Sequence, residues 1–133
     1  MGTWGISAFD NDDASDWLDT IDGESLDSVT LLFDSVLSTP EDAYLEAPQC
    51  SVTLAAAELM AVALGKPGPS VPEQALSWSR NHSLKSDNST IAKAIKAVSR
   101  IAEKSELKDL WDESSAAGDW VKAIADLKLR LQG

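Results

Sequence analysis

Residues 47–65 read APQCSVTLAAAELMAVALG and form the longest mainly apolar segment of the 133-residue chain. A proline at the second position and a glycine at the end are typical of the first turn and the terminus of an α-helix. The apolar run from Val52 to Leu64 is about 13 residues long and contains Glu58, whereas a membrane-spanning helix needs about 20 residues. We therefore expect a central helix from Ala47 to about Leu64 in a soluble protein.

Apolar residues recur at helical spacing on both sides of this segment, and no window alternates as a half-buried strand would. The segment 66–72 contains three prolines and predicts a loop. Capping residues and prolines predict helices that begin near Asn11, Glu24, Thr39, Ala47, Glu73, Asp87, Ser105 and Gly118 or Asp119. With an apolar fraction of 44%, this pattern predicts an all-α fold in which residues 1–133 form a single compact bundle of about six to seven helices.

The cysteine and histidine content argues against several kinds of site. Cys50 is the only cysteine, so an intrachain disulfide or a multi-cysteine metal site is excluded, and a small filler in or near the core is expected. His82, the only histidine, lies in a polar segment typical of an exposed helix end. Met1 is followed by no signal-peptide pattern. We expect a cytoplasmic protein with no cofactor and no metal ion.

The formal charge of −11 is distributed unevenly. Thirteen acidic residues and no Lys or Arg precede Lys66, whereas eleven bases and nine acids follow from that position. The two halves should attract each other, and the basic face expected within residues 87–104 should face either water or the acidic half. Nucleic acid and anionic membranes are poor partners for such a chain, while a basic protein is a favourable one.

Several short motifs carry a resemblance: GTWG at 2–5, FDNDDA at 9–14, DWL at 16–18, YLEAP at 44–48, AAAE at 55–58, SELKDLW at 105–111 and the segment 120–131. These motifs resemble a bacterial family known as domain of unknown function 4259, whose members usually have Gly-Pro-Phe where this chain has Ser7-Ala8-Phe9. The resemblance implies a small bacterial domain with no established activity.

The aspartate-rich segment Asp10–Asp16 is a candidate calcium loop. Counted from Asp10, the pattern fails after the third ligand, because the sixth position is Ser15 and the twelfth is Ile21. Helix capping with acidic residues in the first turn is the favoured interpretation, and weak divalent binding is the alternative.

Glu58 is surrounded in sequence by small and apolar residues, which predicts a partly buried carboxylate. Such a group must be paired, hydrogen-bonded or protonated. We expect a structural acceptor for backbone N–H groups of the N-terminal segment or for a Lys or Arg of the C-terminal half. A catalytic acid is the alternative, although it would need a second carboxylate facing it.

Aromatic residues complete the list of candidates. Trp4 and Phe9 are predicted to anchor the N-terminal segment on the helices. Trp78 and Trp111 lie in short segments with polar neighbours and are predicted to be exposed anchors at an interface.

Two functions from different classes follow. The first is a non-catalytic acidic protein-binding module, in its extreme form an inhibitor or immunity-type protein that covers a basic toxin or nuclease. Its docking residues would be Asp12, Asp13, Asp16, Asp19 and Asp22, with Trp78 and Trp111. The second is a small enzyme or a ligand- or cation-binding domain that uses Glu58 and the segment Asp10–Asp16. The chain itself would be a monomer or a homodimer.

Overall fold

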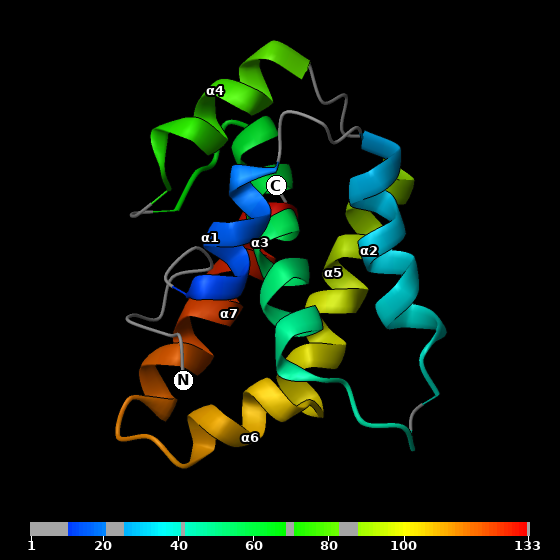
Figure 1. The fold of residues 1–133 in the computed structure, drawn as a ribbon, viewed down its shortest axis with the longest axis vertical. Coiled ribbons are helices and arrows are strands. Elements are labelled where there is room, and N and C mark those ends of the chain that lie inside the picture. Colours follow the sequence, from blue (N-terminus) through cyan, green and yellow to red (C-terminus); the bar gives the residue numbers. More distant parts are fainter. Residues whose placement is uncertain (1–10, 21–25, 41, 69–70, 83–87, 133) are drawn as a thin grey trace.

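The computed structural model describes residues 11–20, 26–40, 42–68, 71–82 and 88–132, and seven α-helices account for most of these residues (Figure 1). The helices are α1 (Asp12–Asp19), α2 (Leu26–Ser38), α3 (Ala47–Ala63), α4 (Glu73–His82), α5 (Asn88–Glu103), α6 (Glu106–Asp112) and α7 (Ala117–Gln132). No strand occurs in these ranges, which confirms the all-α prediction.

Helix α3 is the centre of the bundle, as its sequence predicted. It packs against each of the six other helices, and nearly every residue from Cys50 to Ala61 is buried (Figure 1). A helix that is covered on all sides must be apolar on all sides, which explains why this segment lacks a polar face. Three consecutive alanines, Ala55 to Ala57, are fully buried and give the neighbouring helices room for close approach.

The helix ends follow the local signals in the sequence. The Asn11 side chain accepts a hydrogen bond from the N–H of Ala14 at 2.8 Å, and Ser105 accepts one from the N–H of Lys108 at 3.0 Å. Gly65 follows α3 with a φ of +79°, a conformation that favours glycine. Short-range signals therefore fixed these boundaries.

The helix start predicted at Thr39–Asp42 is wrong. The described residues between α2 and α3 form a turn in which the N–H of Ala43 donates to the carbonyl of Pro40 at 3.0 Å. Arg100 of α5 donates to the carbonyls of Thr39, Pro40 and Ala43 at 2.9–3.2 Å, so these groups need no helical partners. At the other end of the chain, α7 begins at Ala117, slightly earlier than expected.

The start of α3 also depends on a distant residue. Its N-cap residue, Glu46, makes no side-chain capping bond, and the N–H of Ala47 donates instead to the Glu106 carboxylate of α6 at 2.8 Å. The N–H of Glu106 in turn donates to the carbonyl of Leu45 at 2.9 Å. This reciprocal pair joins the first turns of α3 and α6.

Among the described helices, none is both long enough and apolar enough to cross a membrane.

Candidate functional site

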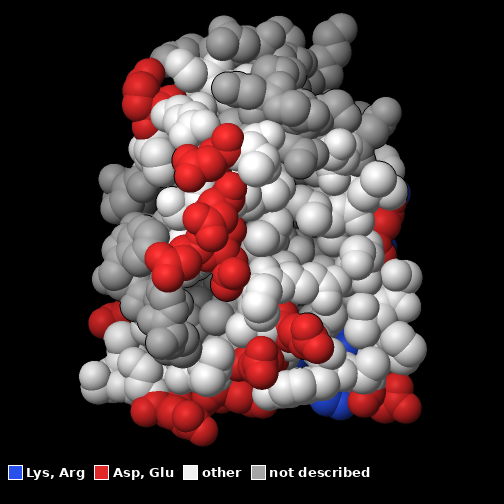
Figure 2. Space-filling view, viewed as in Figure 1, with Lys and Arg blue, Asp and Glu red and all other residues white. Residues whose placement is uncertain are grey.

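Helix α1 presents a row of carboxylates at the surface. Asp12, Asp13, Asp16 and Asp19 are all exposed, and none of them forms an ion pair with another described residue. Figure 2 shows acidic side chains gathered over this helix, with the visible Lys and Arg side chains lying elsewhere on the same face. Four of the five aspartates predicted to dock a partner are thus accessible, while Asp22 lies outside the described residues.

The inner side of α1 holds this surface in place. Ala14 and Leu18 are buried, and α1 packs against α3. The side-chain amide of Gln74, on α4, donates to the carbonyl of Leu18 at 2.8 Å and satisfies one of the free carbonyls at the end of α1. The acidic face is therefore carried by a helix that is fixed on its opposite side.

The acidic residues of α1 are not placed for helix stability alone. Asp12 and Asp13 lie in the first turn, where the helix dipole favours negative charge. Asp16 lies one helical turn from each of the other three aspartates, and such like-charge neighbours destabilise a helix. Asp19 is the last residue of the helix, where the free carbonyls already carry partial negative charge, and no basic residue occurs in that turn. The helix dipole therefore accounts for Asp12 and Asp13, but helix stability does not explain Asp16 and Asp19.

The tryptophans predicted to be exposed are buried. Trp78 is 2% exposed and Trp111 is 8% exposed, so neither is an interface anchor in this structure. Trp111 stacks on Trp120 of α7, with ring centroids 6.4 Å apart and planes inclined by 11°. The polar neighbours of Trp111 lie on the more exposed side of α6, whereas Ser79, next to Trp78, is itself buried. Trp4 and Phe9 lie outside the described residues.

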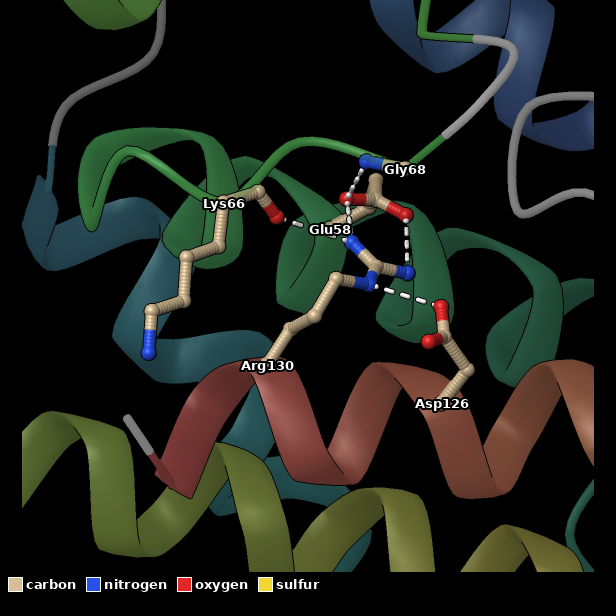
Figure 3. Close-up of polar contacts among 5 residues, drawn as sticks. All are labelled: Glu58, Lys66, Gly68, Asp126 and Arg130. Atoms are coloured by element: carbon tan, nitrogen blue, oxygen red, sulfur yellow. Dashed lines mark hydrogen bonds and ion pairs between the residues drawn. The ribbon is translucent and has the colours of Figure 1, made fainter.

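Glu58 lies in a buried ion pair that links α3 to α7 (Figure 3). Its side chain is 7% exposed and that of Arg130 is 16% exposed. The Arg130 Nη1 and Nη2 atoms donate to Oε2 and Oε1 of Glu58 at 2.5 and 2.9 Å, a bidentate arrangement. Of the two kinds of donor expected for Glu58, backbone N–H groups of the N-terminal segment or a base of the C-terminal half, the described residues show the second.

The surroundings of Arg130 complete the pair. Its Nε donates to Asp126 at 2.8 Å, and Nη1 also donates to the carbonyl of Lys66 at 3.1 Å (Figure 3). The Lys66 side chain points away from the cluster. Burial lowers the pKa of Arg130, but the hydrogen bonds and charges of Glu58 and Asp126 outweigh this effect and leave it above its usual value.

The loop after α3 closes over the carboxylate at a glycine. The N–H of Gly68 donates to Oε2 of Glu58 at 3.2 Å. A Cβ at this position would lie 2.7 Å from Oε1 of Glu58 and 3.1 Å from Nη2 of Arg130, so only glycine lets the backbone come this close. The backbone donor to Glu58 therefore comes from this loop.

This arrangement does not favour a catalytic role for Glu58. Both carboxylate oxygens of Glu58 accept hydrogen bonds, two from the Arg130 guanidinium and one from the Gly68 backbone, and they are not free to contact a substrate. Among the described residues, no group of three or more His, Cys, Asp or Glu side chains could hold a metal ion. Asp10, the first residue of the segment considered as a calcium loop, lies outside those residues.

The remaining candidates are Cys50, the basic face of α5 and His82. Cys50 is fully buried, and burial raises the pKa of its thiol to about 11. On α5, Lys93 pairs with Asp34 of α2 at 3.0 Å, so the basic face of this helix partly meets the acidic half of the chain. The side chain of His82 lies outside the described residues.

Sequence analysis missed the residues that complete the buried pair and the junction between α3 and α6. Gly68 lies in the segment predicted to be a loop, and Asp126 and Arg130 lie one turn apart in the last predicted helix, which does not indicate a contact with Glu58. Glu106 showed only the signal of a first-turn acid, although it reaches the start of α3. No local pattern distinguishes these residues, because their partners are far away in sequence.

A family model described as domain of unknown function (DUF4259) matches residues 2–123. No curated protein and no solved structure matches the chain.

Proposed function

This chain belongs to the DUF4259 family, and we propose that it is a non-catalytic protein-binding module whose acidic helix α1 docks on a basic protein. An inhibitor or immunity-type protein that covers a basic toxin or nuclease is the most specific form of this proposal. One observation carries it: Asp16 and Asp19 are exposed, have no ion pair among the described residues, and lie where they weaken their own helix.

Electrostatics favours such a role. A row of carboxylates on a molecule with a formal charge of −11 attracts a basic protein over several ångströms and accelerates encounter. The tryptophans do not contribute, since both predicted anchors are buried. The proposed contact is therefore mainly polar, and its strength should depend on salt.

The enzyme and cation-binding alternative has less support. It requires Glu58 as a reacting carboxylate, yet both of its oxygens are occupied by Arg130. The proposal is also consistent with a cytoplasmic bacterial protein, which is how we expect the chain to occur.

The test compares two variants with the same change in charge. Asp16→Asn/Asp19→Asn removes two charges from α1, and Asp42→Asn/Glu46→Gln removes two exposed charges from the loop between α2 and α3, which lies below and to the right of α1 in Figure 1. Proteins cross-linked to the wild-type chain in native lysate would be identified and then purified for binding assays. We expect the first variant to lose at least about tenfold in affinity and the second to bind within about twofold of the wild type. Equal losses would show that net charge matters and that the α1 surface does not.

A further inference from the structure

Helix α7 is apolar on two opposite sides. Its buried side contributes Trp120, Ile124, Leu127 and Leu131 to the core. On the other side, Val121, Ala125 and Leu129 follow one another at intervals of four residues and are all exposed, Val121 at 55% and Leu129 at 66%. Core packing explains the first side and leaves the second unexplained.

A comparison with α2 shows that the exposed apolar residues of α7 form a continuous row, whereas the exposed leucine of α2 is isolated. Leu31 of α2 is also 66% exposed, but the residues one and two turns further along its face are Ser35 and Ser38, which are exposed and polar. A single exposed leucine is normal on a protein surface. Three apolar residues in register over two turns form a surface that another helix can cover.

The charges beside this row are self-complementary. Lys122 and Asp126 lie one turn apart along the same edge. Asp126 already accepts from Arg130 through Oδ2, but its side chain is 58% exposed, and the exposed Lys122 forms no ion pair with a described residue. When two copies of a helix pair in antiparallel orientation about a twofold axis, the same edges meet. An axis near Ala125 brings Val121 to Leu129 of the second copy and Lys122 to Asp126 of the second copy, twice by symmetry.

The charge of α7 also suits a second copy. The molecule carries −11 overall, which opposes self-association, but α7 contains three bases and two acids. Helix α5 is the other helix with an excess of bases, and there Lys93 and Arg100 are engaged by Asp34 and by backbone carbonyls. The apolar row therefore lies on a helix where repulsion between copies is low.

We propose that the outer face of α7 is a homodimer interface, in which two copies pair antiparallel around Ala125. The helix has 16 residues and is about 24 Å long, so the pair buries less surface than a standard permanent interface, and the dimer is weak and reversible. This inference does not depend on the proposed function of α1, which lies on a different helix.

Sedimentation of the full chain over a range of concentrations tests the proposal. We expect dimers whose fraction rises with the concentration of the protein. Leu129→Glu should weaken self-association at least about tenfold, whereas Leu31→Glu, at an equally exposed leucine, should leave it within about twofold. A chain that stays monomeric at millimolar concentration, or equal effects of the two substitutions, would overturn the proposal.

Cross-linking tests the orientation. With Cys50 buried, a cysteine introduced by Ala125→Cys should be joined to its copy by a short thiol-specific cross-linker, because this position lies at the axis. Gly118→Cys, seven residues earlier and also exposed, would lie about 20 Å from its copy in the antiparallel pair and should not react in this way. Efficient cross-linking at both positions would indicate parallel pairing and contradict the twofold arrangement.

Discussion

Glu58 and the aspartates of α1 are acidic residues in opposite surroundings. Glu58 lies in the centre of the molecule, where a guanidinium and a backbone N–H take up its charge. The α1 carboxylates lie at the surface, where no described base balances them. Burial explains the difference, because an unpaired buried charge is very unfavourable, whereas water tolerates an unbalanced one. The unbalanced charge is therefore the one available to a partner.

Removing the partner of the buried acid should have the largest effect. Arg130→Met keeps much of the side-chain volume but leaves Glu58 buried without its cation, so we expect a loss of about 3–5 kcal/mol in the free energy of unfolding. Urea denaturation monitored by circular dichroism measures it. Lys128→Met, on the same helix but outside the cluster, should stay within about 0.5 kcal/mol of the wild type.

A double substitution checks the cause. Glu58→Gln/Arg130→Met removes both charges and should recover a large part of the stability lost in Arg130→Met. If the double variant is as unstable as the single one, packing by Arg130 rather than its charge stabilises the fold.

Cys50 is a second buried titratable group, and burial is the main influence on its thiol. Its folded-state pKa of about 11 lies above the ordinary value of 9.0 because burial disfavours the thiolate. The folded state therefore holds this proton more tightly, so the contribution is complete below about pH 9 and is lost as the pH rises to about 11. We expect the wild type to lose about 2 kcal/mol more than Cys50→Ala over that interval.

Denaturation of both proteins at several alkaline pH values measures this difference. Tyr44, whose hydrogen bond to Asp109 raises its pKa to about 12, also titrates at high pH but is common to both proteins. Parallel stability curves for the two proteins would show that the thiol does not ionise differently on unfolding.

A methyl group on Gly68 should disturb the buried pair without removing a charge. Gly68→Ala places a Cβ 2.7 Å from Glu58 Oε1, and we expect a loss of about 1–2 kcal/mol as the loop moves away. Gly118→Ala is the matched control, since a Cβ there meets nothing within 4 Å and alanine favours the helix. A loss at Gly118 as large as that at Gly68 would contradict the close-approach explanation.

The smallest effect concerns α1. Asp16→Asn removes three unfavourable like-charge neighbours and should stabilise the protein by about 0.3–1 kcal/mol at low salt, a gain that high salt abolishes. Asp12→Asn removes a favourable first-turn charge and should destabilise it slightly. Thermal denaturation at two salt concentrations compares them, and a destabilising Asp16→Asn would mean that Asp16 has a structural role.

Local signals predicted much of the fold. Asn11 and Ser105 cap their helices, and α3 begins next to Pro48 and ends before Gly65. The prediction of a helix start at Thr39 was wrong, because Arg100, which is far away in sequence, donates hydrogen bonds to the carbonyls of that turn. Such long-range partners leave no local trace in a single sequence.

The candidate site was predictable to a similar extent. The apolar neighbours of Glu58 predicted a buried acceptor for backbone N–H groups of the N-terminal segment or for a Lys or Arg of the C-terminal half. Arg130 lies 72 residues away and could not be chosen among these alternatives. The burial of Trp111 depends on Trp120, a contact between two helices that periodicity alone does not reveal.

The salt dependence of association tests the docking role of α1 most directly. The rate constant for binding of the captured partner would be measured by stopped flow at increasing ionic strength, for the wild type and for Asp16→Asn/Asp19→Asn. We predict a steep fall with salt for the wild type and a clearly shallower one for the variant. A wild-type rate that does not change with ionic strength would contradict the account.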